Sequence, residues 1–369
     1  MKKVIFISAL AIAAAVSCTK SDIVDTKFNE AISFENYLGR DAMTKASVYS
    51  TDANGVSNLT SVGLYGYYTG KDEWKPETNA NLWNDAALTS TDGKTWTYTG
   101  GDKYWTNDAD KYTFLAYAPK GNEYLTTDAE ENTNGQNPSI IYATPLSLND
   151  QIDVLYANTL YNAEDKSGHV NMVRPSDNTV ALTFKHALSR ITVKASENQA
   201  NYKYNIKKIS LTSNQFSTNA SLKLNKNGVE NWAWTVNTTW APTEDVKETY
   251  VIFEGEQDIT TEVDFAKVGN NYTNYLMVVP VNFAVKEGDV FKNTAKLKVT
   301  YTTEFDGQIS TPMTKELDIN TNFEMGKAYS FNLVFAPNDD NKISFTVSVS
   351  NWEDEKDITA GNPEESPWK

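Results

Sequence analysis

The sequence predicts an all-β protein, and three observations support this fold class. Apolar and polar residues alternate strictly in several stretches, which is the period of a strand with one buried face. Aromatic residues make up 12% of the chain, mostly Tyr and Trp, and such rings favour pleated, half-buried surfaces. Turn motifs separate the stretches, as in sandwiches and barrels. These motifs are Gly100-Gly101, Lys120-Gly121-Asn122, Asn227-Gly228, Asp306-Gly307 and Pro337-Asn338-Asp339-Asp340.

The first residues have the features of a secretion signal. Lys2 and Lys3 precede an apolar run over residues 4–16, which is shorter than the roughly 20 residues needed to span a bilayer. The run ends in Ala15-Val16-Ser17-Cys18, which resembles a bacterial lipobox. The resemblance implies cleavage before Cys18 and acylation of its thiol, which would anchor the chain in a membrane.

The composition argues against several function classes. Cys18 is the only cysteine and His169 and His186 are the only histidines, so zinc sites and Ser-His-Asp hydrolases lack their residues. The net charge of −15 repels nucleic acid. Among the 48 acidic residues none lies in a recognisable catalytic motif. We therefore expect no enzyme, no cofactor and no metal site.

Two acidic stretches have oxygen ligands that could contact calcium. They are Asn107-Asp108-Ala109-Asp110 and Asn338-Asp339-Asp340-Asn341. Neither has the spacing of an EF-hand loop, and turns capped by Asn or Asp side chains explain both.

The strand predictions follow from the apolar pattern. Residues 112–119 and 276–281 are largely apolar on both faces, so each is predicted to be a central strand that a proline ends. Residues 295–301, 329–335 and 343–349 alternate, so each is predicted to bury one face.

Residues 182–193 change phase within one run. Leu182 and His186 share one face, whereas Ile191 and Val193 continue in the opposite phase, so a bulge or bend is predicted near Ser189 and Arg190. His186 then lies on an apolar face, where we expect a core histidine hydrogen-bonded to the backbone.

Two polar stretches interrupt the strands. Residues 119–139 are rich in Asn, Thr and Glu and are predicted to form a long surface loop. Residues 162–179 are also polar, and we expect a domain boundary there. The predicted divisions are a signal peptide (1–17), a lipidated tether (18–27), an N-terminal domain (28–175) and a C-terminal domain (176–369).

Several segments, taken in chain order, resemble the motifs of the fimbrillin family (Mfa-like and FimA-like) of Bacteroidetes, the subunits of type V pili. They are Ala31-Ile32-Ser33-Phe34 with Arg40, residues 62–68, 111–119, 153–157, 182–193, 323–333 with Gly326-Lys327, and 347–352. Together with the lipobox they cover nearly the whole mature chain.

The resemblance implies two tandem transthyretin-like antiparallel β-sandwich domains and a fimbrial subunit or adhesin exposed on the outer membrane. It also implies assembly with other pilin subunits by donor-strand exchange, in which a protease removes the first strand and another subunit supplies a replacement. Arg40 lies in the polar stretch Gly39-Arg40-Asp41 and is the first candidate for processing, with Lys45 as the second. The other arginines fit less well, because Arg174 precedes a proline and Arg190 lies in a predicted strand.

The donor strand and the role in the pilus stay open at this point. The alternating residues Ile343, Phe345, Val347 and Val349 are predicted to form either a donor strand or the final internal strand. The acidic tail over residues 354–369 is more polar than a good donor, so a shaft, an anchor and a tip subunit all remain candidates. A host receptor or a glycan is a further possible partner.

A monomeric, glycan-binding surface lipoprotein is the alternative function. Its evidence would be a flat, exposed pair of tryptophans, and packing between neighbouring strands is the competing explanation for these residues. The tryptophans concerned are Trp83, Trp96, Trp105, Trp232, Trp234 and Trp240.

Overall fold

The structure is a computed structural model, and it describes most of the chain between residues 30 and 352. The described ranges are 30–37, 58–130, 132–197, 202–224, 234–239, 249–259, 262–268, 271–272, 275–283, 286–287, 290–291, 295–336 and 342–352. Strands dominate these ranges, and a 3-10 turn, η2 (Thr133–Gly135), interrupts them. None of the helical turns within these ranges is long and apolar enough to cross a membrane. The predicted all-β fold is confirmed.

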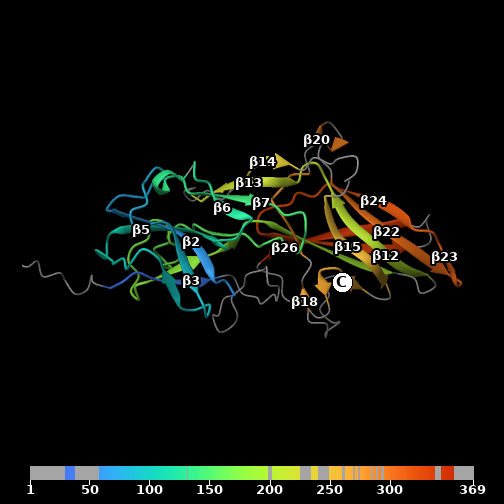
Figure 1. Cartoon of the computed structure of the whole chain (residues 1–369), viewed down its shortest axis with the longest axis horizontal. Helices are drawn as coiled ribbons and strands as arrows, with labels where there is room; N and C mark the ends of the chain where they lie inside the picture. The colour runs from blue at the N-terminus through green and yellow to red at the C-terminus, as the bar shows by residue number, and fades with distance from the viewer. Residues whose placement is uncertain are drawn as a thin grey trace, which may run out of the picture.

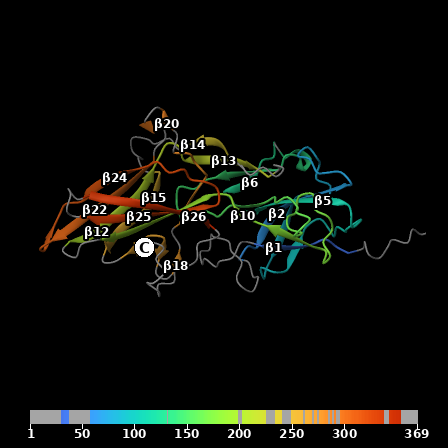
Figure 2. The same ribbon diagram turned by 180° about the vertical axis from the view of Figure 1, so that it is seen from behind.

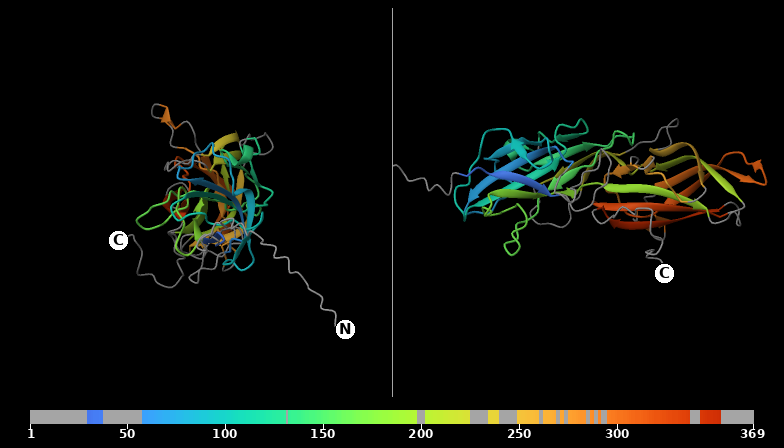
Figure 3. Two further views of the ribbon diagram at one scale, coloured as in Figure 1. Left: turned by 90° about the vertical axis from the view of Figure 1, so that its left-hand side faces the viewer. Right: turned by 90° about the horizontal axis from the view of Figure 1, so that it is seen from below.

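The molecule is elongated, with two groups of strands arranged end to end (Figure 1). Figure 3 shows the blue and green strands at one end and the orange and red strands at the other. Each group contains sheets stacked in the manner of a sandwich.

The first group is built on a six-stranded antiparallel sheet and a separate two-stranded pair. The order of the large sheet is β10 (Lys185–His186), β8 (Leu155–Ala157), β5 (Lys111–Ala118), β2 (Ser61–Gly70), β3 (Trp83–Ser90) and β4 (Trp96–Tyr98). The pair consists of β1 (Ser33–Tyr37) and β9 (Thr179–Thr183). A four-stranded sheet covers this group and has the order β14 (Thr235–Thr239), β13 (Ser217–Lys223), β7 (Ser139–Ala143) and β6 (Leu125–Thr127).

The second group contains two five-stranded sheets. The first has β16 (Val263–Asp264), β11 (Ser189–Glu197), β25 (Lys327–Ala336) and β26 (Lys342–Asn351), with β19 (Leu276–Val278) also paired to β11. The second has β15 (Tyr250–Ile259), β12 (Lys203–Thr212), β22 (Ala295–Phe305) and β23 (Gln308–Ile309), with β24 (Met313–Ile319) also paired to β22. Two short hairpins complete the group: β17 (Lys267–Val268) with β18 (Asn271–Tyr272), and β20 (Lys286–Glu287) with β21 (Val290–Phe291).

Two of the described strand pairings are parallel, in a fold that is otherwise mainly antiparallel. β1 runs parallel to β9, and β11 runs parallel to β25. The other named pairings are antiparallel. A parallel pair needs a long connection between its strands, and residues 38–178 separate β1 from β9. Local alternation cannot reveal such a distant pairing.

Three apolar cores hold the sheets together. One lies in the first group around Val62, Leu64 and Phe114, and another lies in the second group around Leu297 and Phe331. The third contains residues from both groups, including Tyr65 of β2 and Met277 of β19. The two groups therefore share buried surface.

The predicted break in residues 182–193 is confirmed, and its cause is a change of sheet. The chain leaves β10 and enters β11 at Ser189. Leu182 belongs to the core of the first group, Leu188 to the shared core and Ile191 to the core of the second group. The apolar phase changes because successive segments face different cores.

Two glycines of β2 let aromatic rings from neighbouring strands pack directly against its backbone. A Cβ atom on Gly63 of β2 would lie 2.0 Å from Cε1 of Tyr117, and one on Gly66 would lie 2.6 Å from Cε3 of Trp83. Both distances are too short for real contacts, so the absence of a side chain lets the buried rings cross the strand.

Three of the other predicted elements have clear outcomes. The strand predicted over residues 112–119 is present as the buried strand β5, which runs from Lys111 to Ala118. The alternating residues 295–301 and 329–335 bury one face in β22 and β25. The turn Asp306-Gly307 joins β22 to β23 with positive φ at both residues, as a two-residue hairpin requires.

Two predictions need correction. Residues 119–139 contain β6 and η2, and the hydroxyl of Tyr67 donates to the carbonyl oxygen of Gly135 at 2.6 Å, so this stretch covers the sheet instead of forming a free loop. The strand predicted over residues 276–281 ends earlier, at Val278. β19 is buried, but among the described strands it pairs with β11 alone and is therefore not central in its sheet.

The expected domain boundary at residues 175 and 176 stays a prediction. Strand pairs cross that position, because β9 pairs with β1, β10 pairs with β8, and β13 pairs with β7.

Candidate functional site

The described chain begins with residues 30–37, and this segment lies between β9 and residues 103–105. Residues Ser33 to Tyr37 of β1 pair with Thr179 to Thr183 of β9, and the Ser33 amide donates to the carbonyl oxygen of Asn178 at 3.2 Å. On the other side, the Ile32 amide donates to the carbonyl oxygen of Lys103 at 2.8 Å, and the Trp105 amide donates to that of Glu30 at 3.3 Å. Figure 2 shows β1 at the same end of the molecule as β2 and β5. The predicted opening strand is therefore present, with backbone partners on both sides at its start.

Two side chains of this segment reach the core. Ile32 is 1% exposed and Phe34 is 5% exposed, whereas Ser33 and Glu35 between and after them are exposed. The Phe34 ring meets three aromatic rings edge-on, with centroid distances of 5.5 Å to Trp83, 5.9 Å to Tyr98 and 5.5 Å to Phe114. Edge-to-face contacts of this kind stabilise a buried ring beyond its area burial alone.

A charged contact fixes the start of the segment. The Arg174 guanidinium donates from Nη2 to a Glu30 carboxylate oxygen at 3.1 Å and from Nη1 to Asp108 at 3.3 Å. Its Nε donates to the side-chain oxygen of Asn178 at 2.7 Å, and the Asn178 amide nitrogen also donates to Glu30. The side chain of Arg174 is 10% exposed, whereas those of Glu30 and Asp108 are 53% and 65% exposed, so solvent screens the carboxylate side of both pairs. We call the surroundings of the segment the β1 site, defined by Trp83, Tyr98, Phe114, Arg174 and Asn178.

The structure does not describe the residues predicted for lipidation and processing. Cys18, Arg40 and Lys45 fall outside the described residues, so the structure does not test them. Arg190, which the sequence placed in a strand, is buried in β11.

The predicted donor or final strand is present as β26. It pairs with β25 along its whole length, from Lys342 to Asn351. Ile343 is buried and Val347 is half-buried, but Val349 is 53% exposed. Among the described strands none pairs with the other edge of β26. β26 is thus the last described strand of its sheet, and its role as a donor stays a prediction.

His186 has a different partner from the one expected. Its Nδ1 lies 3.0 Å from a carboxylate oxygen of Asp153, a side chain with no exposed surface. The imidazole also stacks on Trp352 with a centroid distance of 4.2 Å. The Arg190 guanidinium lies 5.1 Å from the same Trp352 ring and 4.7 Å from the Tyr275 ring. The histidine is a core residue as predicted, but a buried carboxylate replaces the expected backbone oxygen.

The described tryptophans favour packing over a glycan platform. Trp83, Trp105 and Trp234 are buried and Trp96 is half-buried, while Trp232 and Trp240 lie outside the described residues. The Trp234 indole nitrogen donates to the carbonyl oxygen of Ala187 at 2.7 Å. Within the part of the chain that the structure covers, no flat exposed pair of tryptophans is present.

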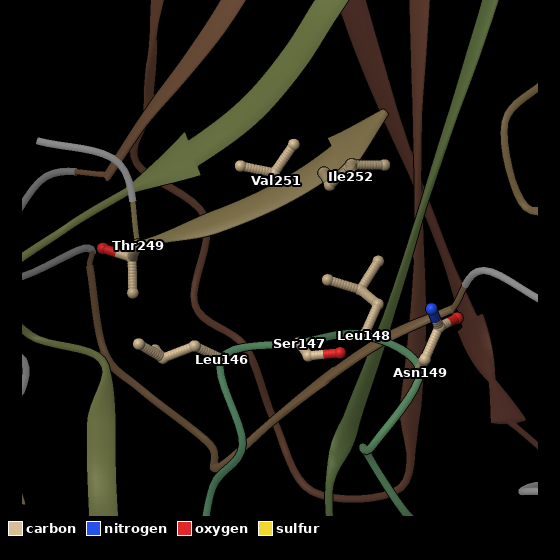
Figure 4. Close-up of a pocket in the computed structure, with 7 residues that line it drawn as sticks. All are labelled: Leu146, Ser147, Leu148, Asn149, Thr249, Val251 and Ile252. Atoms are coloured by element: carbon tan, nitrogen blue, oxygen red, sulfur yellow. The ribbon is translucent and has the colours of Figure 1, made fainter. Parts of the chain in front are cut away.

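A shallow pocket of about 480 Å³ lies between a loop and the start of β15 (Figure 4). Leu146 and Val251 are exposed at its mouth, and Leu148 and Ile252 are buried. Ser147, Asn149 and Thr249 supply its polar atoms. None of these seven residues is charged, so the pocket offers no group for acid–base chemistry.

In the acidic stretch at residues 107–110, the polar side chains contact other groups of the same chain. The Ala109 amide donates to the Asn107 side-chain oxygen at 3.1 Å, which is the expected turn. Asp110 pairs with Lys71 at 2.8 Å. Burial opposes ionisation of Asp110, but contacts with Lys71, Tyr68 and Thr106 hold the pKa of its carboxyl below the ordinary value. Within the described ranges, no group of three or more His, Cys, Asp or Glu side chains could hold a metal ion. Residues 338–341 lie outside these ranges.

The sequence did not identify the charged contact at Glu30. In the sequence, the proline after Arg174 argues against processing there and gives no sign of a structural role. That role depends on residues 30 and 108, which are distant in sequence. The chain has three arginines, and this scarcity is the one feature of the sequence that could have drawn attention to Arg174.

Comparison with known proteins extends these observations. The profile of the fimbrillin-like family matches residues 44–352. The fimbrium subunit Fim1C of Phocaeicola vulgatus is 25% identical over 87% of this chain and 89% of that protein.

Two solved structures show a more distant similarity. A candidate cell adhesion protein from Bacteroides uniformis matches 87% of this chain and 99% of its own, with 15% identity and a TM-score of 0.42. The tip fimbrial protein Mfa3 from Porphyromonas gingivalis, with a C-terminal truncation, matches 86% of this chain and 99% of its own, with 10% identity and a TM-score of 0.37. Both TM-scores are low, so the family assignment depends on the profile match. That match covers most of the chain, and the chain therefore belongs to the fimbrillin-like family.

Proposed function

We propose that this chain is a fimbrial subunit of the bacterial cell surface, assembled when a strand of another subunit replaces β1. Family membership and the similarity to a fimbrium subunit support a structural role in a polymer. The signal sequence and the lipobox-like Ala15-Val16-Ser17-Cys18 support export as an outer-membrane lipoprotein with a lipid on Cys18.

The placement of β1 is the observation that carries this proposal. The strand is five residues long, and its Phe34 fills an apolar site together with Ile32, the residue just before it. Full burial of such a side chain contributes about 1.5–3 kcal/mol, so an empty site would expose costly apolar surface. It would also leave backbone groups of β9 unpaired. A strand from another subunit would satisfy both, which is the logic of β-augmentation.

Removal of β1 requires a cut after it. Arg40 and Lys45 follow β1 closely in the sequence, so cleavage at either would free the strand from the rest of the chain. The proposed partners are accordingly other fimbrial subunits, and the proposed location is the cell surface.

N-terminal sequencing of protein extracted from the fimbrial fraction tests this function. We expect the assembled protein to begin at Asp41, or at Ala46 if Lys45 is the processing site. Arg40→Gln should abolish the first start and Lys45→Gln the second, and each variant is the control for the other. Assembled protein that begins at Cys18 and retains residues 30–37 would contradict strand replacement.

A further inference from the structure

The β1 site holds a guanidinium in position by contacts that do not depend on β1. Asn178 accepts from Nε of Arg174 at 2.7 Å, and Asp108 accepts from Nη1 at 3.3 Å. Both partners belong to the body of the protein and stay when Glu30 leaves. The remaining nitrogen, Nη2, points at the carboxylate of Glu30 at 3.1 Å. A preorganised guanidinium favours a carboxylate in that place, because its N–H groups need little further ordering.

Two further positions of the segment are selected by shape. Ile32 and Phe34 point into the core, two and four residues after Glu30, whereas Ala31 and Ser33 are exposed. The three rings around Phe34 leave a position that suits another aromatic side chain. The period of two follows from strand geometry, so alternate residues of any replacement strand would face the same three positions.

Apolar alternation alone does not fix the register. A strand shifted by two residues still presents apolar side chains to the same face. A carboxylate at the Arg174 end of the strand distinguishes these registers, because in a shifted strand the carboxylate would no longer reach the guanidinium. Ion pairs of this kind contribute more to specificity than to total affinity.

We propose that the β1 site selects a replacement strand by three alternate side chains: an acidic residue, then an aliphatic one, then an aromatic one, running parallel to β9. Arg174 and Asn178 recognise the acidic side chain. This inference rests on the proposed function and specifies its partner.

The chain's own sequence indicates that the partner is a different subunit. Ile343-Ser344-Phe345 repeats the tripeptide Ile32-Ser33-Phe34, but the residue two positions before Ile343 is Asn341, where β1 has Glu30. A second copy of this chain therefore supplies the aliphatic and aromatic residues without the carboxylate. The partner is thus a distinct fimbrial subunit whose strand carries Asp or Glu at that position.

Peptide competition on the full chain tests this selection. A recognition sequence for a site-specific protease is inserted within residues 38–57, and the cleaved protein is loaded with a labelled peptide of residues 30–37. Unlabelled peptides then compete: the same sequence, its Glu30→Gln and Glu35→Gln forms, residues 341–348, and the Asn341→Glu form of that peptide. Glu35 is exposed, so Glu35→Gln is a control with the same change of charge.

We expect Glu30→Gln to weaken competition by about fivefold and Glu35→Gln to change it by less than about twofold. Asn341→Glu should strengthen the second peptide by about fivefold. On an Arg174→Gln protein, the unaltered peptide of residues 30–37 and its Glu30→Gln form should differ by less than about twofold, because the neutral Asn178 amide alone remains to contact either side chain. The peptide comparisons on the unaltered β1 site remain informative if that variant does not fold.

The outcomes separate the two proposals. If the cleaved protein exchanges no peptide, strand replacement itself fails. If all peptides compete equally, replacement stands and the selection by charge is wrong. If the peptide of residues 341–348 competes as well as that of residues 30–37, a second copy of this chain is the partner and the assignment to a different subunit is overturned.

Discussion

Arg174, His186 and Arg190 are polar residues that lie where strands of different sheets meet. Arg174 joins the start of β1 to Asp108, and His186 joins β10 to Asp153. Arg190 contacts the rings of Tyr275 and Trp352. Removal of one partner of a buried charge is costly, because the other stays desolvated. These side chains therefore fix how strands meet, where the apolar pattern alone would permit other arrangements.

His169 makes stability depend on pH. The ring is fully buried, and its Nδ1 lies 2.6 Å from the carbonyl oxygen of Phe114. Burial lowers the pKa of His169 from 6.5 to about 4, so the folded state keeps the neutral ring. The unfolded chain takes up the proton first as the pH falls. The stability that the neutral ring contributes is complete above pH 6.5 and is lost as the pH falls towards 4, by about 3 kcal/mol in total.

Urea unfolding between pH 7 and pH 4 measures this loss. His169→Asn retains an N–H donor for Phe114 but does not titrate, so we expect a flatter dependence of the unfolding free energy over that interval. The variant is less stable than the parent at pH 7, because it leaves a cavity. An identical slope in the variant and the parent would show that His169 is not the titrating group.

Among the elements, β26 is held at one end by a single large side chain. Trp352 follows the strand directly, is buried, and stacks on His186 of β10. Its amide also donates to the carbonyl oxygen of Gly326 at 2.9 Å. The contact therefore ties the last described strand of the second group to a strand of the first.

Trp352→Ala should release the end of β26. We expect a loss of about 3–5 kcal/mol in unfolding free energy and faster hydrogen exchange in peptides that cover Lys342–Asn351. Val349→Ala changes the same strand at an exposed position and is the control, with an expected effect below about 0.5 kcal/mol. Unchanged exchange in β26 of the tryptophan variant would mean that other contacts hold this strand.

The sequence predicts individual strands better than their partners. The alternation in β22 and β25 has a local period and was sufficient, as was the two-residue turn at Asp306-Gly307. The parallel pairing of β1 with β9 joins residues 146 positions apart, such as Ser33 and Thr179, and no local pattern encodes it. The same holds for the contact of Glu30 with Arg174, which depends on that pairing. Local alternation, aromatic content and turn motifs are thus sufficient to predict the fold class, whereas long-range packing determines the β1 site.

For the whole molecule, the two groups of strands share a core, and the chain passes between the groups more than once. Tyr65 of β2, Leu222 of β13 and Met277 of β19 belong to one buried cluster. In addition, β13 comes after β11 in the chain but pairs with β7 of the first group. Because neither group can unfold without exposing this cluster, we expect the described chain to unfold as one cooperative unit.

Three matched leucine substitutions test that cooperativity. Leu64→Ala lies in the core of the first group, Leu297→Ala in the core of the second and Leu222→Ala in the shared core, and each should cost about 2–5 kcal/mol. In one cooperative unit, each substitution lowers the unfolding free energy of the same single transition. Each also speeds hydrogen exchange in both β5 and β22. Ile309→Ala, at a position that is 71% exposed, should leave the transition unchanged. A shared core transmits a loss of stability in one group to the other. If Leu64→Ala speeded exchange in β5 alone and Leu297→Ala speeded it in β22 alone, the two groups would therefore be independent domains.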